Sequence, residues 1–259
     1  MTASRRGALG IGLALAFGYM AVREGLPLIA GFGRELEFAP LDRPAGFRRM
    51  AGGATSSGGF DLFVGLSDGP EGAPDPALAH AVEADPCGAL FAGWSGDPQV
   101  VPIASFSDYN CPICRVTTPR LAGMEAVRDG TAQVTWHELP ILGESSLLAA
   151  RAALAADLQG AYAAFQERLT GNPFRATPAY MRALAAELDL DHDRLVADMR
   201  GAPVARRIAR SLALRDLFGF AGTPAIVVGR TVVEGDLDGD TLALLIERER
   251  ADGPPPGCT

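Results

Sequence analysis

The sequence predicts an α/β domain with a helical insertion, preceded by an apolar N-terminal segment. A buried-strand pattern at 100–106 leads directly into a Cys-x-x-Cys pair and a helix. A second strand pattern follows at 133–139, after a connection long enough for a parallel crossover. After a largely helical stretch at 144–218, two short strands joined by a tight turn and a final helix complete the pattern.

The composition fits a packed domain and gives no support to nucleic-acid binding. The chain has 259 residues, of which 48% are hydrophobic, so it can bury a sizeable core. Its formal net charge is −8, and no long basic run occurs outside the N-terminus. Because binding to nucleic acid depends on neutralising phosphates, we expect no nucleic-acid partner.

The first 33 residues predict an export or anchor segment. Ser4-Arg5-Arg6 precedes an uncharged run at 7–22. As a helix at about 1.5 Å per residue, this run spans roughly 24 Å, short of a ~30 Å hydrocarbon core. We therefore expect an uncleaved anchor with its arginines in the cytoplasm, or a signal peptide cleaved at a site such as Ala14-Leu15-Ala16. A twin-arginine signal and a buried core helix are the alternatives.

Residues 34–86 predict an irregular tether, and the folded domain is expected over 87–259. Prolines, paired glycines and serines punctuate this stretch heavily. Short ordered pieces are expected at 60–64 and 76–83. The predicted role of the tether is to space the domain from the membrane.

The cysteine pair is predicted to lie where the first strand passes into a helix. Asp108 or Asn110 is suited to cap that helix, and Pro112 fits its first turn. Cys111 would then face unpaired N–H groups and the positive end of the helix dipole, which lower a thiol pKa. Cys114, one turn on, could attack a mixed disulfide at Cys111.

The pair has two other interpretations. A Cys-x-x-Cys can be half of a zinc site, but structural zinc needs four ligands, and the remaining cysteines and the three histidines are scattered. No metal site is therefore predicted. The pair could also be two buried, inert cysteines.

The remaining elements follow from periodicity. Residues 144–218 predict four or five helices packed as a lid on one side of the sheet. The last part of 219–229, a turn at Gly229-Arg230 and residues 231–234 predict an antiparallel hairpin, and 240–250 a closing helix with one apolar face.

Three stretches resemble a known family. They read Phe-Ser-Asp-Tyr-Asn-Cys-Pro-Ile-Cys at 106–114, Glu-Leu-Pro-Ile-Leu-Gly at 138–143 and Gly-Thr-Pro-Ala at 222–225. With the element order, they resemble the thioredoxin fold with a helical insertion, as in the DsbA family of exported thiol-disulfide oxidoreductases. The resemblance covers about residues 98–250. It implies a protein disulfide oxidoreductase with no cofactor beyond its own dithiol.

The resemblance also implies roles for individual residues. Cys111 would be the exposed nucleophile and Cys114 the resolving thiol. Pro224 would be a cis-proline facing the pair, although an ordinary trans proline opening a strand is the alternative. A cis bond there would present the backbone of Thr223 to a substrate strand. Pro112 and Ile113 are expected to contact substrate as well.

Two positions depart from the family pattern. Ser105 stands where the family has a buried acid, and Glu138 could substitute for it or lie at an exposed strand end. Ile113 stands where DsbA has a histidine, which predicts a less oxidising couple. His137 is a possible remote replacement, but a surface histidine on a strand is the expectation.

The expected partners are cysteine-containing exported proteins and a membrane or periplasmic redox partner. The expected location is the periplasmic side of the bacterial inner membrane, or the soluble periplasm if the N-terminus is cleaved. Cys87 and Cys258, near the two ends of the domain, could form a structural disulfide or remain free thiols. A different function, a copper chaperone using Cys111 and Cys114 as soft ligands, is the second hypothesis.

Overall fold

The computed structural model describes residues 36–57, 75–171, 174–255 and 257–258. The chain divides into two units, residues 1–37 and 38–259. The first lies almost wholly outside the described residues, as does the predicted export or anchor segment. In the described part, no helix is long and apolar enough to cross a membrane.

A mixed sheet forms the centre of the second unit, in the order β1-β2-β6-β5-β3-β4. The strands are β1 (Ala39–Pro40), β2 (Arg48–Met50), β3 (Val101–Ser107), β4 (Ala132–Glu138), β5 (Ala225–Val228) and β6 (Thr231–Glu234). β3 pairs in parallel with β4 and antiparallel with β5, and β5 and β6 form the antiparallel hairpin. The predicted parallel pair and hairpin are thus confirmed.

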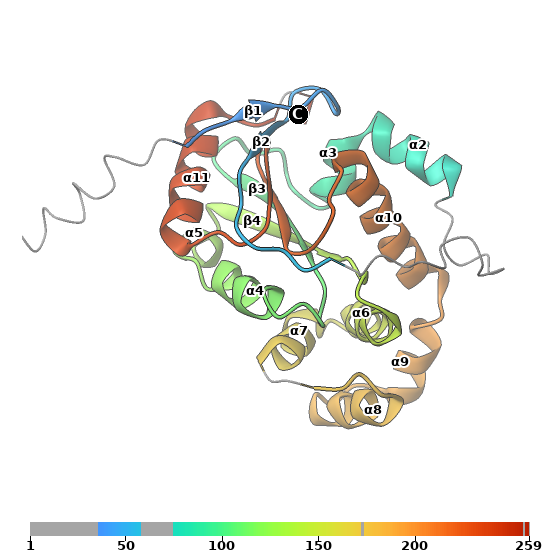
Figure 1. Cartoon of the computed structure of the whole chain (residues 1–259). Helices are drawn as coiled ribbons and strands as arrows, with labels where there is room; N and C mark the ends of the chain where they lie inside the picture. The colour runs from blue at the N-terminus through green and yellow to red at the C-terminus, as the bar shows by residue number, and fades with distance from the viewer. Residues whose placement is uncertain (1–35, 58–74, 172–173, 256, 259) are drawn as a thin grey trace, which may run out of the picture. The chain divides into compact units, whose positions relative to one another are not determined.

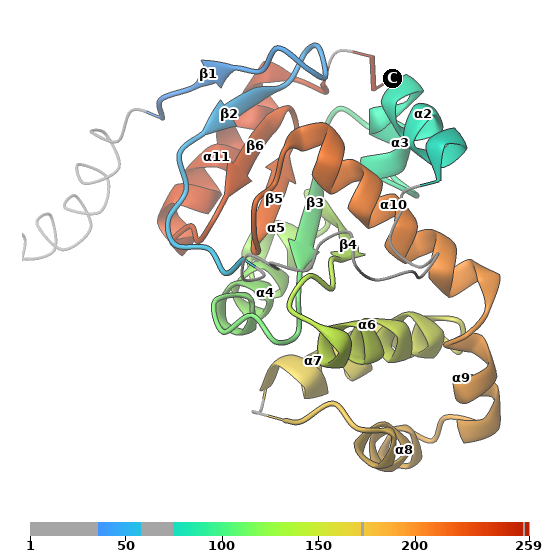
Figure 2. The same cartoon turned by 45° about the vertical axis from the view of Figure 1, so that its right-hand side comes forward.

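Helices cover both faces of this sheet (Figures 1 and 2). On one face lie α4 (Cys114–Ala122), α5 (Glu125–Arg128) and α11 (Gly239–Asp252). On the other lie α2 (Pro76–Ala84), α3 (Pro86–Leu90) and α10 (Ala202–Phe218). Every residue of β3 is buried, which explains its continuous run of apolar and small side chains.

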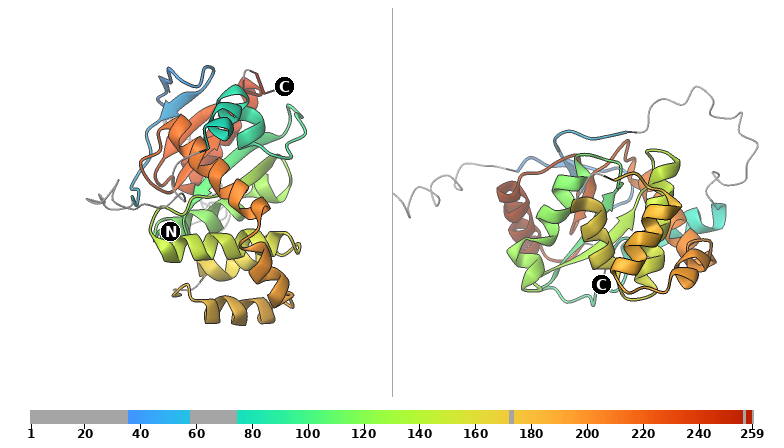
Figure 3. Two further views of the ribbon diagram at one scale, coloured as in Figure 1. Left: turned by 90° about the vertical axis from the view of Figure 1, so that its right-hand side faces the viewer. Right: turned by 90° about the horizontal axis from the view of Figure 1, so that it is seen from below.

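The insertion contains five helices in the described residues, which agrees with the predicted four or five, but they do not all pack on one side of the sheet as expected (Figure 3). They are α6 (Glu144–Asp157), α7 (Tyr162–Gly171), α8 (Pro178–Glu187), α9 (His192–Asp198) and α10. Figure 3 shows α6 to α9 as a layer beyond one end of the sheet, while α10 returns along a sheet face. This layer has its own core, where small alanines of α6 pack closely around Phe165, Leu169 and Leu195.

Part of the predicted tether belongs to the folded unit, which corrects the expectation of irregular chain over 34–86. β2 pairs in parallel with β6, and Phe47 and Met50 are buried. Helix α2, capped by Asp75, packs with α10. A strand of three residues carries no readable periodicity, so its place in the sheet depends on a distant partner that the local sequence does not reveal. Residues 60–64, predicted as a short ordered piece, lie outside the described residues.

Candidate active site

The cysteine pair lies at the end of β3, in a turn that leads into α4. The helix begins at Cys114 with Ile113 as its N-cap residue, and no side chain caps it. This corrects the expectation that Cys111 and Pro112 already form the first helical turn. The Cys111 N–H donates to the Asp108 carbonyl oxygen at 3.0 Å, so a tight turn precedes the helix.

Asp108 anchors this turn to the chain after β4 instead of capping α4. One carboxylate oxygen accepts from the backbone N–H groups of Ile141 (2.8 Å) and Leu142 (2.9 Å). The other accepts from the Asn110 N–H (2.8 Å) and the Ser146 hydroxyl (2.6 Å). These four bonds fix the position of the loop that carries Cys111 and join two of the three stretches that resemble the family.

The structure brings Cys111, Cys114 and Thr223 together. Both cysteines are free thiols. The Cys114 N–H donates to the Cys111 sulfur at 3.1 Å, and the Cys111 thiol donates to the Thr223 carbonyl oxygen at 3.4 Å. The Thr223–Pro224 peptide bond is cis, as the resemblance implied. Pro112 is exposed and Ile113 half-buried, directly beside Cys111 in sequence.

Cys111 is buried rather than exposed, which corrects the expectation of an exposed nucleophile. Its exposed fraction is 0% and that of Cys114 is 2%. Ser56 forms an isolated antiparallel bridge with Thr223, in which each N–H donates to the other carbonyl oxygen (2.7 and 2.8 Å). No pattern in the sequence signals this contact, because it joins residues 167 positions apart (223 minus 56) and involves a stretch predicted to be irregular.

The pKa values of the two thiols are shifted in opposite directions. A hydrogen bond from the Cys114 side chain is the main cause that lowers the pKa of Cys111 to about 6; burial opposes it, while Thr223, the Cys114 backbone N–H and Ser56 add to it. Burial, followed by the hydrogen bond with Cys111, raises the pKa of Cys114 far above its ordinary value. At neutral pH the pair therefore holds one thiolate, on Cys111, and one thiol, on Cys114.

Glu138 lies in a buried tyrosine-lined site rather than at an exposed strand end. The hydroxyls of Tyr109 and Tyr162 each donate to its Oε1 at 2.7 Å. Oε2 is buried and has no hydrogen-bond partner among the described residues. Burial is the main cause that raises the pKa of Glu138 to about 7.

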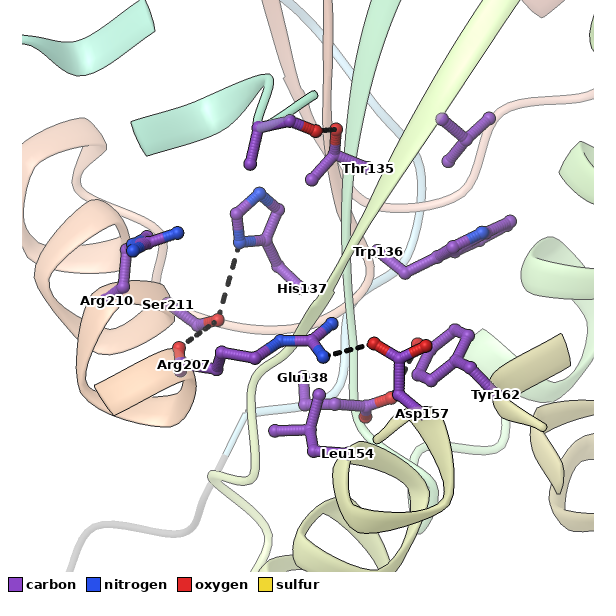
Figure 4. Close-up of a pocket in the computed structure, with 12 residues that line it drawn as sticks. Thr135, Trp136, His137, Glu138, Leu154, Asp157, Tyr162, Arg207, Arg210 and Ser211 are labelled. Atoms are coloured by element: carbon purple, nitrogen blue, oxygen red, sulfur yellow. Dashed lines mark hydrogen bonds and ion pairs between the residues drawn. The ribbon is translucent and has the colours of Figure 1, made fainter. Parts of the chain in front are cut away.

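Beside Glu138 is a cavity of about 380 Å³ between β4, α6, α7 and α10. Figure 4 shows Glu138 and Tyr162 among the residues that line it, with the ion pair between Arg207 and Asp157 beside them. No hydrogen bond in the described part of the chain links Glu138 to Cys114. The suggestion that Glu138 replaces the family's buried acid therefore remains a hypothesis.

His137 is buried, so the expectation of a surface histidine is wrong. Its Nε2 lies 2.8 Å from the Leu90 carbonyl oxygen, and its ring stacks on Phe106 with centroids 4.5 Å apart. Burial is the main cause that lowers the pKa of His137 to about 4. It is uncharged at neutral pH, so it does not replace the imidazolium that DsbA places between its cysteines.

Cys87, in α3, forms a disulfide with Cys258 near the C-terminus. Their Cα atoms are 5.2 Å apart, within the usual range for such a bond. Of the two alternatives left open by the sequence, the structure has the paired one. Among the described residues no group of three or more His, Cys, Asp or Glu side chains could hold a metal ion.

The sequence matches the model of the DsbA-like thioredoxin domain over residues 102–247, more than half of the chain. The chain belongs to this family. The match spans both cysteines, the helical insertion and the cis-proline loop. The predicted fold, a thioredoxin-like fold with a helical insertion, and the predicted enzyme class, a DsbA-like protein disulfide oxidoreductase, are confirmed at the level of the family.

Solved structures agree with the DsbA-like assignment. A thioredoxin-like oxidoreductase from Silicibacter pomeroyi is 37% identical, with a TM-score of 0.58 over 63% of this chain and 97% of that one. The catalytic domain of ScsC from Proteus mirabilis is 25% identical, with a TM-score of 0.55 over 67% of this chain and 98% of that one.

Curated relatives of this DsbA-like chain include larger proteins. The Na⁺/H⁺ antiporter NhaA 3 from Salinispora tropica is 34% identical over 134 residues, which are 49% of this chain and 20% of the antiporter. The chain thus spans about a fifth of the length of this relative.

Proposed function

We propose that this chain is an exported oxidoreductase that donates or rearranges disulfides in cysteine-containing proteins, through Cys111 and Cys114. The single observation that carries the proposal is the asymmetry of the pair. The pKa of Cys111 is lowered to about 6, whereas that of Cys114 is raised. Such an arrangement stabilises the reduced form through the Cys111 thiolate, which favours passing a disulfide on to a substrate.

The proposed reaction has two exchange steps. A substrate thiolate attacks Cys111 in the Cys111–Cys114 disulfide; the new bond joins substrate to Cys111, and Cys114 leaves and takes up a proton. A second substrate thiolate then attacks the substrate sulfur of the mixed disulfide. The substrate leaves oxidised by two electrons, and Cys111 departs as the stabilised thiolate. In isomerisation, the reduced Cys111 thiolate instead attacks a substrate disulfide first.

The proposed substrate-binding edge is the backbone beside Pro224. Next to the cis bond at Pro224, the Thr223 N–H and C=O, which pair with Ser56 in the structure, are the groups that an extended substrate chain would pair with. The Thr223 carbonyl oxygen lies 3.4 Å from the Cys111 sulfur. A substrate strand paired there would bring its cysteine to Cys111 by main-chain bonds. Pro112 and Ile113 would form the neighbouring contact surface.

We further propose that residues 1–33 export the chain or anchor it at the periplasmic side of the inner membrane. The support is the arginine pair followed by an uncharged run in the sequence. A membrane or periplasmic redox partner would then reoxidise or reduce the pair. Expression with and without this segment, followed by cell fractionation, tests the assignment; equal export of both forms would contradict it.

Trapping tests the exchange chemistry. In Cys114→Ser the Cys111 thiolate should attack a disulfide of a scrambled protein and release one substrate thiolate, and the mixed disulfide should accumulate because the resolving thiol is gone. Cys111→Ser should form no adduct and show no turnover, and Cys87→Ser/Cys258→Ser serves as a control outside the pair. Adduct formation in Cys111→Ser, or stoichiometric copper binding by an inactive wild type, would overturn the proposal.

A further inference from the structure

A segment of the chain itself occupies the edge proposed for substrate. After β2, residues 53–57 run toward the end of the sheet where α4 begins, which Figure 2 shows as the pale blue trace. Ser56 exchanges two backbone hydrogen bonds with Thr223, at 2.7 and 2.8 Å. Further along, the Gly53 N–H donates to the Asp236 carbonyl oxygen (2.9 Å), and the Asp236 N–H donates to that of Ala54 (3.1 Å).

The fit of this segment to the edge is close. A Cβ at Gly222 would lie 2.8 Å from the Ser56 carbonyl oxygen, and one at Gly235 would lie 2.3 Å from that of Gly53. Backbone therefore meets backbone with no room for side chains between them. Ser56 and Thr223 exchange two backbone hydrogen bonds, as residues do when a strand is added to the edge of an antiparallel sheet.

Ser56 is the one residue of the segment that turns inward. It is half-buried, whereas Ala54, Thr55 and Ser57 are exposed. A hydrogen bond between its side chain and Cys111 is one of the causes that lower the pKa of that thiol. Cys111 itself is fully buried beneath these contacts. Serine carries oxygen where cysteine carries sulfur, so the Ser56 side chain cannot form a disulfide.

We propose that residues 53–57 are a built-in pseudosubstrate, with Ser56 in the place of the reacting cysteine, which a protein substrate must displace. This inference rests on the proposed function. It also defines the substrate class: an extended segment whose cysteine is flanked by small residues, since the resident sequence Gly-Ala-Thr-Ser-Ser holds its place by main-chain bonds and buries no large side chain. Displacement is feasible because a segment held by main-chain bonds, with no large apolar side chain buried, opens at little cost.

The register is tested by cross-linking in the full chain. In Ser56→Cys with Cys114→Ser, the Cys111 thiolate attacks oxidised glutathione and releases one glutathione thiolate. The thiolate introduced at position 56 then attacks the Cys111 sulfur and releases the second. Proximity should make this bond form about tenfold or more faster than in the Thr55→Cys and Ser57→Cys controls in the same background.

Peptide mapping under non-reducing conditions measures these rates. Equal rates at the three positions would overturn the proposed register. Failure of Cys111 to take up glutathione in Cys114→Ser alone would instead overturn the proposed nucleophile, and with it this inference.

Displacement is tested by removing one donor. Ser56→Pro deletes the N–H that bonds to Thr223, whereas Thr55→Pro deletes an N–H that makes no backbone hydrogen bond in the described structure. If residues 53–57 block the edge, Ser56→Pro should raise the alkylation rate of Cys111 about fivefold or more. The reason is that a larger fraction of the molecules would then have this segment detached from Thr223. Measurement at about pH 8 keeps Cys111 a thiolate in both variants.

Turnover on a reduced, unfolded protein gives the second readout. Ser56→Pro should lower KM, and Thr55→Pro should match the wild type in KM. An active wild type whose Cys111 alkylation and KM are unaltered by Ser56→Pro would show that the segment is only structural. A wild type with no turnover would overturn the proposed function instead.

Discussion

The backbone N–H of Cys114 lies 3.1 Å from the sulfur of Cys111 and donates a hydrogen bond to it. This N–H belongs to the first residue of α4, so it has no partner within the helix. The turn at 108–113 therefore aims the sulfur at the unpaired donors of a helix that begins after it. The positive end of the helix dipole still favours the Cys111 thiolate, although Cys111 precedes the helix rather than opening it.

Ile113→His should make the pair more oxidising. An imidazolium next to the Cys111 thiolate stabilises the reduced form and lowers the pKa of Cys111 below about 6. A decrease of one pKa unit corresponds to about 1.4 kcal/mol, or a rise of about 30 mV in reduction potential. Equilibration with a glutathione redox buffer measures the change. Ile113→Gln, polar but neutral, is the matched control; equal potentials in the two variants would contradict the electrostatic explanation.

Glu138→Gln should change how stability depends on pH. Burial raises the pKa of Glu138 to about 7, so the folded state holds this proton more tightly than the unfolded chain. The contribution to stability is therefore complete below the unfolded pKa of about 4.5 and is lost as pH rises through about 7. Relative to the wild type, the glutamine variant should gain stability over this window, by up to about 3 kcal/mol.

His137 titrates over part of the same pH range and has the opposite effect on stability. The effect of Glu138 is therefore measured as the difference in unfolding free energy between the wild type and Glu138→Gln. Burial lowers the pKa of His137 to about 4, and the stability tied to its neutral form is lost as pH falls from about 6.5 toward 4. Denaturant unfolding of the wild type, Glu138→Gln and the exposed control Glu144→Gln at several pH values separates the two. If the difference in stability between the wild type and Glu138→Gln is constant with pH, Glu138 titrates normally and the prediction is wrong.

Loss of the Cys87–Cys258 disulfide should lower stability and leave the redox chemistry intact. The bond joins two buried cysteines that are 171 residues apart in the sequence. Removal of such a cross-link typically costs about 2–4 kcal/mol. Unfolding of Cys87→Ser/Cys258→Ser measures the loss, and thiol titration of the denatured, unreduced wild type should find two free thiols. Four free thiols would refute the pairing, and an altered pKa of Cys111 in the double variant would show that the bond also acts on the active site.

The helices and strands that have a clear local sequence pattern could be predicted from the sequence. β3, β4, the hairpin and the insertion were foreseeable because each has a run of apolar residues with the right period or a turn residue at the right place. The start of α4 was not, since Asp108 and Asn110 resemble helix caps but Asp108 bonds instead to the chain at 141–146. Only the tertiary structure shows that the Asp108 carboxylate accepts hydrogen bonds from residues 141–146 and not from the first turn of α4.

The site residues whose type and spacing identify their chemistry could be predicted from the sequence. The features that depend on contacts between distant residues could not. The Cys-x-x-Cys pair and the Thr223–Pro224 loop were identified because few other functions use those residues in that order. The burial of Cys111 was missed because Ser56, in a stretch of small and flexible residues, offers no signal of pairing with Thr223. Likewise, the burial of His137 follows from α3 and α10 packing over β4, not from the strand itself.

The ionisation of Cys111 is the property on which the proposed exchange chemistry depends most directly. Thiolate absorbance in the ultraviolet, titrated in the reduced protein and in Cys111→Ser, isolates its contribution. We expect a single transition near pH 6 in the wild type that is absent from Cys111→Ser. No second thiolate should appear at neutral pH, because the pKa of Cys114 is raised. A midpoint near the ordinary thiol value of about 8.5 would contradict this expectation.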